Sequence, residues 1–317
     1  MGEKEPILIV GSGALALLFG AGLASAGYRV TLLGSWRQGI EAVRARGICL
    51  RSEKTCRTLP AEAVTTPETV RGVRWALVLV KSWQTSRAAQ QLRECLAEDG
   101  LALTLQNGLG NREMLEEALG SDRVLQGVTT YGATLLGPGE VRLGGVGKVL
   151  LQADPRAAIF HRALQEAGFE VEETHSLESA IWGKLVINSA INPLTALLNV
   201  PNGELLERPT ARALMGEIAE ETASVARAQG ISLPFESARL AAEAVARQTA
   251  ANLSSMLQDV RRGAPTEIDA ICGAIAQKAQ ELTLNAPLNR CMWQLVRALK
   301  SPPHPSPHSE PPQFALQ

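Results

Sequence analysis

The feature that most constrains this fold is a short apolar run that ends in a glycine-rich turn near the start of the chain. Residues 7–10 (ILIV) precede Gly11-Ser12-Gly13-Ala14-Leu15-Ala16, and residues 14–26 are rich in alanine and leucine. A second apolar run follows at 28–33 (YRVTLL). This order predicts a strand, a helix and a second strand, which is the βαβ unit of a parallel sheet.

The glycine-rich turn has the spacing of a dinucleotide-binding loop. Gly11 would allow the tight turn, Gly13 would let the backbone approach a pyrophosphate, and the small Ala16 would let helix and strand pack closely. The free N–H groups and the positive dipole end of the helix would attract the anion. The alternative is an ordinary turn with glycines for geometry, but the surrounding βαβ pattern favours a bound cofactor.

The end of the second predicted strand bears on which dinucleotide is bound. NAD sites usually place Asp or Glu there, whereas this chain has Leu33-Gly34-Ser35-Trp36-Arg37 and no acid. Ser35 and Arg37 could bind the 2′-phosphate of NADP, although Arg37 could equally be a solvated surface residue. The sequence therefore favours NADP.

The rest of the chain divides into a mixed region and a helical region. Ahead of residue 175, strands and helices alternate, and a glycine-rich stretch at 137–151 is expected to form a hairpin that closes this region. Residues 176–300 are alanine-rich and helically periodic, without a convincing strand. The further elements expected in the first region are strands at 75–80, 101–106 and 124–130, helices at 84–97, 111–119 and 157–168, and a short segment at 169–173.

These patterns predict an α/β N-terminal Rossmann-type domain with a mostly parallel sheet, followed by an all-helical C-terminal domain. The first would occupy residues 1–174 and bind the dinucleotide. The second would occupy residues 175–300, bind the substrate and support a possible homodimer. Residues 301–317 contain six prolines, and this tail is predicted to be disordered.

Composition excludes several classes of function. The net charge is −1, so neither nucleic acid nor a membrane surface is an expected partner. No run approaches the roughly 20 apolar residues of a membrane span, and the N-terminus does not have the pattern of a signal peptide. The five cysteines are odd in number, widely spaced and without a CxxC pair. They argue against a disulfide framework or zinc site and favour a cytoplasmic protein.

A polar stripe interrupts an apolar stretch in the helical region. Lys184, Asn188 and Asn192 recur at every fourth residue, which places them on one helix face. Pro193 would leave the carbonyl of Ser189 without its helical partner. The stripe could face a cleft, but a solvated face with a snorkelling lysine explains the pattern equally well. Ser255 and Glu267 are also candidates, although each alone is more often structural.

Together these segments resemble the ketopantoate reductase family, whose members are 2-dehydropantoate 2-reductases. The resemblance covers residues 7–300, and its motifs are long and specific. It is carried by 81–84 (KSWQ), 106–110 (QNGLG), 182–188 (WGKLVIN), 191–197 (INPLTAL), 199–205 (NVPNGEL), 252–259 (NLSSMLQD) and 266–269 (TEID).

The resemblance implies NADPH-dependent reduction of 2-dehydropantoate to (R)-pantoate in pantothenate and coenzyme A biosynthesis. Lys184 would be the general acid. Substrate contacts would come from Asn107, Asn188, Asn192, Asn202 and Ser255. Besides the loop Gly11-Ser12-Gly13-Ala14-Leu15-Ala16, cofactor contacts would come from Lys81, Asn107, Ala133 and Glu267. The family's usual arginine for the 2′-phosphate falls at Ser35 here, with Arg37 two residues on.

Two other functions remain open. The chain could reduce another small 2-keto acid, or it could be a non-catalytic NADPH-binding sensor. The complete polar set around Lys184 argues against the sensor, because a protein without catalysis has no need of it. No metal site is expected, and the two histidines of the folded region, His161 and His175, lie outside the motifs. A lysine could both stabilise a developing oxyanion and supply the proton.

Overall fold

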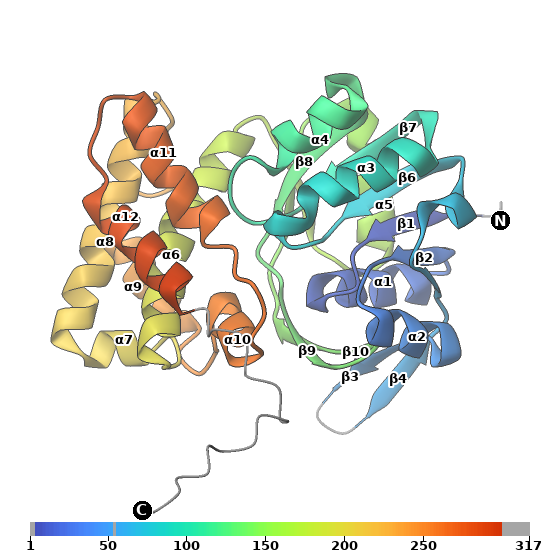
Figure 1. Ribbon diagram of the computed structural model, residues 1–317, viewed down its shortest axis with the longest axis horizontal. Helices are drawn as coiled ribbons and strands as arrows, with labels where there is room; N and C mark the ends of the chain where they lie inside the picture. The colour runs from blue at the N-terminus through green and yellow to red at the C-terminus, as the bar shows by residue number, and fades with distance from the viewer. Residues whose placement is uncertain (1–3, 53–54, 300–317) are drawn as a thin grey trace, which may run out of the picture.

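The computed structural model describes residues 4–52 and 55–299. These residues form a half that is built on β-sheets and a half that contains only helices, and the two lie side by side (Figure 1). The predicted fold class is confirmed. The proposed boundary at 174/175 falls between the last strand and the first helix of the second half, and the tail at 301–317 lies outside the described residues.

The main sheet has eight strands in the order β12-β11-β8-β7-β6-β1-β2-β5. All neighbouring pairs are parallel except β8 and β11. The four residues of β1 are all buried, as expected of a parallel sheet that is covered on both faces. The strands are β1 (Ile7–Val10), β2 (Val30–Leu33), β5 (Glu62–Val64), β6 (Val73–Val78), β7 (Leu96–Thr104), β8 (Val124–Thr129), β11 (Val149–Gln152) and β12 (Val171–Thr174).

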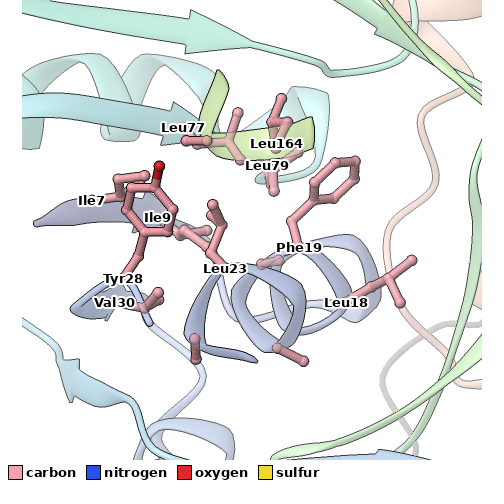
Figure 2. Close-up of a cluster of buried hydrophobic side chains, with 14 of the residues drawn as sticks. Ile7, Ile9, Leu18, Phe19, Leu23, Tyr28, Val30, Leu77, Leu79 and Leu164 are labelled. Carbon is pink, nitrogen blue, oxygen red and sulfur yellow. The ribbon is translucent and has the colours of Figure 1, made fainter. Parts of the chain in front are cut away.

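Helix α1 connects β1 to β2 and holds the sheet half together. Its side chains meet those of β1, β2 and β6 in a buried cluster (Figure 2). Phe19 of α1 stacks on Phe169, with ring centroids 4.4 Å apart, and aromatic contacts of this kind add to the burial energy. The helices of this half are α1 (Ala14–Ser25), α2 (Arg37–Arg46), α3 (Thr85–Cys95), α4 (Asn111–Leu119) and α5 (Ala158–Glu166).

A second sheet, which the sequence did not predict, packs against α1. Its strands are β3 (Ile48–Arg51), β4 (Cys56–Leu59), β9 (Gly132–Gly137) and β10 (Glu140–Gly145), in the order β4-β3-β10-β9. The expectation of one hairpin at 137–151 is wrong: β10 pairs with β9, and β11 joins the main sheet beside β8. Apolar alternation identifies a strand, but it does not say which sheet the strand joins.

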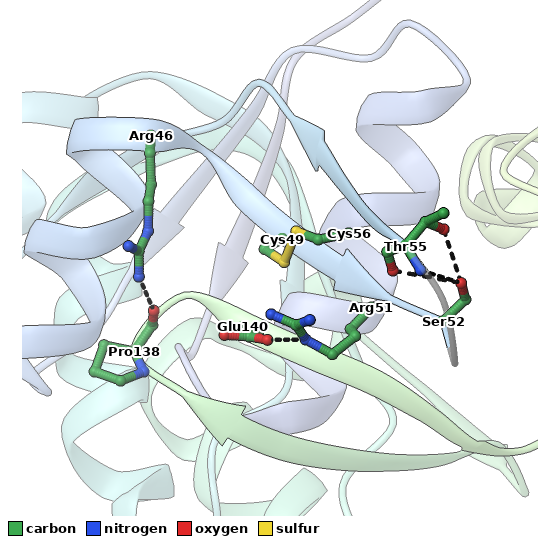
Figure 3. The surroundings of a disulfide bond; sticks show 8 residues. All are labelled: Arg46, Cys49, Arg51, Ser52, Thr55, Cys56, Pro138 and Glu140. Atoms are coloured by element: carbon green, nitrogen blue, oxygen red, sulfur yellow. Dashed lines mark hydrogen bonds and ion pairs between the residues drawn. A yellow bond between two sulfur atoms is a disulfide. The ribbon is translucent and has the colours of Figure 1, made fainter.

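The expectation that the cysteines form no disulfide is also corrected. Cys49 of β3 and Cys56 of β4 are joined, with their Cα atoms 5.8 Å apart (Figure 3). The two strands form an antiparallel hairpin, so residues seven positions apart in sequence become close neighbours in space. Spacing rules developed for disulfide frameworks do not detect a single bond across a hairpin. Cys95, Cys272 and Cys291 are free.

The second half is organised around α6, which packs against α8, α9, α10 and α12 and also contacts β8 and β11. Pro193, which has no N–H group to donate, lies within α6. In place of that donor, the Sγ of Cys272 donates to the carbonyl of Ser189 at 3.9 Å. No helix in the described residues is long and apolar enough to cross a membrane. The helices are α6 (Leu177–Leu198), α7 (Glu204–Glu207), α8 (Pro209–Ala228), α9 (Ala238–Gln248), α10 (Ser255–Arg261), a π-helical turn η5 (Asp269–Gly273), α11 (Ala274–Glu281) and α12 (Pro287–Ala298).

Candidate active site

A cavity of about 1580 Å³ lies between the two halves and is lined by residues of both. Its sheet side is formed by the segments that follow β1, β2, β6 and β7, including Gly11, Ser35, Lys81 and Asn107. Open α/β sheets bind ligands at these carboxyl ends of their strands. The cavity is therefore in the position expected of a cofactor and substrate site.

The glycine-rich turn forms one wall of the cavity with its backbone. Gly11 has a φ of +138°, and a Cβ atom there would lie 3.0 Å from the backbone of Leu79, so only glycine fits without strain. At Gly13 a Cβ atom would meet open space. Ser12, Ala14 and Leu15 also line the cavity, whereas Ala16 is fully buried and packs inside the sheet half.

The start of α1 is suited to an anion. Its first helical hydrogen bond runs from Leu17 N to Gly13 O at 3.0 Å, and no side chain caps the helix. The N–H groups ahead of Leu17 therefore have no intrahelical acceptor, and they add to the positive end of the helix dipole. This arrangement fits the diphosphate of a dinucleotide.

The polar stripe of α6 faces the same cavity. Lys184, Asn188 and Asn192 all line it, so the cleft-facing interpretation holds and the solvated-face alternative does not. The Nζ of Lys184 donates to the backbone carbonyl of Thr129, at the end of β8, over 2.5 Å. Burial lowers the pKa of Lys184 to about 8, against the opposing charge of Glu267. Such a lysine can exchange its proton near neutral pH.

Two amide side chains in the cavity wall have unused acceptors. Within the described residues, the buried Oδ1 atoms of Asn107 and Asn202 have no hydrogen-bond partner, and both residues line the cavity. The Nδ2 of Asn202 donates to Thr249 Oγ1 at 2.9 Å, which fixes the orientation of the amide. Buried acceptors without partners are costly, so these oxygens fit the hydroxyl or amide donors of a ligand.

Ser255 lies at the first position of α10 and lines the cavity. The hydroxyl that caps this helix belongs to Ser254, whose Oγ accepts from Leu257 N at 3.1 Å. Because Ser254 provides the cap, the hydroxyl of Ser255 remains available to a ligand. Residues 252–254, which belong to the helically periodic region, therefore lie ahead of this helix.

Glu267 connects the helical half to the sheet half. Its carboxylate accepts from Ser82 N at 3.1 Å, from Asn107 Nδ2 at 3.3 Å and from Lys81 Nζ at 3.3 Å. It is only 5% exposed. The alternative that Glu267 merely stabilises a helix start is not supported, because its carboxylate binds three groups from two cavity loops instead.

Asp259 is a site residue to which the sequence motif assigned no role. It is 2% exposed, and its carboxylate pairs with Lys81 Nζ at 2.7 Å and with Arg262 at 2.7 Å. Burial opposes the charge on Lys81, but Glu267 and Asp259 outweigh it and raise the pKa of Lys81. Asp259 lies inside the motif at 252–259, so its position was visible although its partners were not.

The expected adenosine end of the cavity departs from the sequence prediction at one residue. Ser35 and Ala133 line the cavity, and Ser35 Oγ accepts from Gln84 Nε2 at 3.5 Å. Arg37 is exposed at the start of α2 and is not part of the cavity wall. The structure thus brings together all predicted site residues except Ala16 and Arg37.

Comparison with protein-family models gives two matches that cover most of the chain. The model described as "Ketopantoate reductase PanE/ApbA" matches residues 7–156, and "Ketopantoate reductase PanE/ApbA C terminal" matches residues 176–300. The 2-dehydropantoate 2-reductase of Halobacterium salinarum is 37% identical, covering 92% of this chain and 97% of that protein. The enzyme of the same name from Pyrococcus horikoshii is 35% identical, with coverages of 93% and 97%.

Solved structures with the same fold include two different types of dehydrogenase. A PanE/ApbA family ketopantoate reductase from Ralstonia eutropha has a TM-score of 0.86 and 32% identity, covering 93% of this chain and 98% of that chain. A D-mandelate dehydrogenase with NADH and anilino(oxo)acetate also has a TM-score of 0.86, at 27% identity and the same coverages.

Proposed function

The chain belongs to the ketopantoate reductase family, and from this premise we propose that it reduces 2-dehydropantoate to (R)-pantoate with NADPH. As a 2-dehydropantoate 2-reductase, it would serve pantothenate and coenzyme A biosynthesis. One observation supports this proposal more strongly than the others. The glycine-rich turn before α1 and the Lys184 face of α6 line a single cavity, so a dinucleotide and a small keto acid can meet there.

The residues present fit the cofactor. The turn Gly11–Gly13 and the uncapped start of α1 would hold the diphosphate, while Lys81, Ala133 and Glu267, which line the same cavity, would contact other parts of the dinucleotide. When bound, the nicotinamide supplies the hydride that adds to the C2 carbonyl carbon. The remaining steps of the reaction fall to side chains of this chain.

Lys184 would manage the charge and the proton. As the carbonyl carbon is reduced, negative charge grows on its oxygen, and a nearby ammonium group both stabilises that charge and donates a proton. The contact with the Thr129 carbonyl holds the Nζ atom in place before substrate arrives. A pKa of about 8 keeps the lysine mostly protonated at neutral pH while easing proton release.

Asparagine and serine side chains would orient the keto acid. Asn188 and Asn192 share the rigid helix of Lys184, so their spacing to the proton donor is fixed. Asn107 and Asn202 present unpaired Oδ1 atoms, which can accept from the substrate hydroxyl, and Ser255 adds a hydroxyl at the start of α10. An amide supplies both donor and acceptor, which suits a ligand with carboxylate, carbonyl and hydroxyl groups.

The test is a steady-state assay of NADPH and NADH oxidation with 2-dehydropantoate and a panel of other 2-keto acids. We expect the highest kcat/KM for 2-dehydropantoate with NADPH. The panel includes benzoylformate, because a structural neighbour is a D-mandelate dehydrogenase. A higher kcat/KM for another acid would overturn the substrate, and tight NADPH binding without turnover of any acid would favour the sensor.

A homodimer and a cytoplasmic location are further parts of the proposal. Leu295 and Leu299, one helical turn apart, are exposed at the end of α12, and a second copy could cover them. Cys291 is an exposed free thiol, which suits a reducing compartment, whereas the Cys49–Cys56 disulfide is of a kind more common in oxidising ones. Light scattering of the purified protein tests the dimer, and fractionation of cells tests the location.

A further inference from the structure

Three arginines that line the cavity have no partner among the described residues: Arg57, Arg87 and Arg142. Arg142 is paired with Arg51 across the sheet, so it shares the face of Arg51 and not that of Arg57. Arg57 of β4 and Arg87 of α3 both line the cavity. Within residues 4–52 and 55–299, neither guanidinium group has a hydrogen bond, an ion pair or a ring contact. Arg51 also lines the cavity, but it is ion-paired with Glu140 (Figure 3). Arg57 and Arg87, unpaired among the described residues, are therefore available to an anionic ligand.

Arg87 lies next to the loop that follows β2. Gln84 occupies the N-cap position of α3, and its Nε2 donates to Ser35 Oγ at 3.5 Å. Arg87 is three residues further on, and residues spaced by three share a helix face. Arg87 therefore extends the side of α3 that contacts Ser35. In a Rossmann fold, the end of β2 is where the ribose hydroxyls of the adenosine are recognised.

Arg57 approaches the same region from the second sheet. It pairs with Leu50, which in turn pairs with Val141, and residues paired across strands share a sheet face. Val141 and Leu59 of this face are buried in the core that contains α1. The face of Arg57 is thus turned toward α1, whose start is the diphosphate site, while the neighbouring positions Arg51 and Cys56 face the opposite way.

We propose that Arg57 and Arg87, in place of Arg37, bind the 2′-phosphate that distinguishes NADPH from NADH. The inference rests on the proposed function and assigns its cofactor preference to residues outside the fingerprint loop. A 2′-phosphate carries about two negative charges, and two guanidinium groups can bind it through charge-assisted, bidentate hydrogen bonds. Ser35 and Gln84 would add neutral donors. The pair would take over from the arginine that the family usually has at the position of Ser35.

The fold by itself does not fix this preference. The D-mandelate dehydrogenases with a similar fold were solved with NADH, a cofactor that lacks the 2′-phosphate. A chain that prefers NADPH therefore needs cations of its own at this position. Arg37 lies outside the cavity wall, at the exposed start of α2.

The test uses two ligands that lack the nicotinamide and differ only in the phosphate. Calorimetry would measure Kd for 2′-phospho-ADP-ribose and for ADP-ribose with the wild-type protein, Arg57→Ala, Arg87→Ala, the double variant and the matched control Arg37→Ala. We expect each single variant to weaken 2′-phospho-ADP-ribose binding about 10- to 100-fold, the range for hydrogen bonds to charged groups. Binding of ADP-ribose and the Arg37→Ala affinities should stay unchanged, as should the unfolding temperatures.

The outcomes separate this inference from the proposed function. Equal losses for both ligands, a loss confined to Arg37→Ala, or a wild-type protein without preference for the phosphorylated ligand would overturn the assignment. Loss of the preference in the two variants supports it, even if no 2-keto acid is reduced in the separate turnover assay. Absence of turnover with every 2-keto acid would contradict the proposed reaction without contradicting the phosphate site.

Discussion

The two ends of the cavity are built in different ways. At the α6 end the polar groups hold one another: Lys184 donates to the Thr129 carbonyl, and Glu267 accepts from three groups of the sheet half. At the β2 end, which is the expected adenosine end, Ser35 is exposed and its Oγ accepts one hydrogen bond, from Gln84 at 3.5 Å. Arg57 and Arg87 have no partner among the described residues. The polar groups of the α6 end are therefore preorganised, whereas the cations of the β2 end are free to bind a negatively charged group of the cofactor.

This difference separates the reaction from the choice of cofactor. The proton donor and the amides of Asn188 and Asn192 lie on one rigid helix, and their geometry does not depend on the adenosine. The cations of the other end come from a β-hairpin and a helix start, which can change without disturbing α6. Solved relatives of this fold include both a ketopantoate reductase and NADH-bound dehydrogenases. Substitutions at one end should therefore leave the property of the other end unchanged.

The largest expected effect is on turnover at the α6 end. Lys184→Met removes the proton donor and should lower kcat by about 100-fold or more, the range for general acid catalysis. The Kd for NADPH and its ratio to the Kd for NADH should stay near the wild-type values. Rapid-quench or steady-state kinetics together with calorimetry would measure both quantities.

The stability of Lys184→Met can also be predicted, and measuring it shows whether misfolding causes the lower kcat. The pKa of Lys184 is lower in the folded protein than its ordinary value of 10.5. The buried charge thus destabilises the fold fully below pH 8, and the effect disappears as the pH rises toward 10.5. At neutral pH, Lys184→Met should unfold at or above the wild-type temperature. Lys148→Met, which removes an exposed partner of Glu172, is the matched control; near-normal kcat in Lys184→Met would contradict its role.

The second prediction concerns the pH dependence of turnover and involves only the α6 end of the cavity. If Lys184 donates the proton with a pKa of about 8 in the free protein, kcat/KM for reduction of the keto acid should be level below pH 8. It should fall about tenfold per pH unit above it, because the protonated fraction falls at that rate. The reverse reaction should rise over the same range, since the neutral amine is then the base. A reduction profile that stays level to pH 10 would contradict the assignment, and NADPH binding is expected to be independent of pH in this window.

The third prediction concerns the contacts between the two halves. Glu267→Gln keeps the shape of the side chain but removes the charge that faces Lys81 and the Ser82 N–H. We expect KM for NADPH to rise about tenfold, in line with hydrogen bonds to charged groups, with a smaller change in kcat than in Lys184→Met. The control is Glu281→Gln, which alters an exposed pair with Lys278. Equal KM values in the two variants would show that Glu267 does not couple the halves.

The α6 end could be predicted from the sequence because its geometry is local. Lys184, Asn188 and Asn192 obey helical spacing, and the fingerprint turn obeys strand–turn–helix order, so their positions follow from short-range rules. The contact with Thr129 and the pairing of Asp259 with Lys81 could not be foreseen, because each joins segments that are far apart in sequence. Only tertiary packing decides such partners.

The β2 end resisted prediction for a different reason. The strands β3 and β4 are only four residues each, and Cys56–Leu59 is mostly exposed, so they lack the apolar alternation that identifies a buried strand. Without the hairpin, neither the disulfide nor the approach of Arg57 to α1 could be inferred. Arg37 was the natural candidate because it is two residues from Ser35 in sequence, but it does not line the cavity.

The smallest expected effect tests whether the hairpin of β3 and β4 influences only the β2 end of the cavity. Cys49 and Cys56 close a short loop with a sequence separation of seven, so Cys56→Ser should cost about 2 kcal/mol of stability. Because β4 carries Arg57, the variant should weaken NADPH binding a few-fold while leaving kcat unchanged. Thiol titration of the denatured wild-type protein should find three free cysteines. Five would mean that backbone pairing alone holds the hairpin, and a fall in kcat in Cys56→Ser would mean that the two ends of the cavity are not independent.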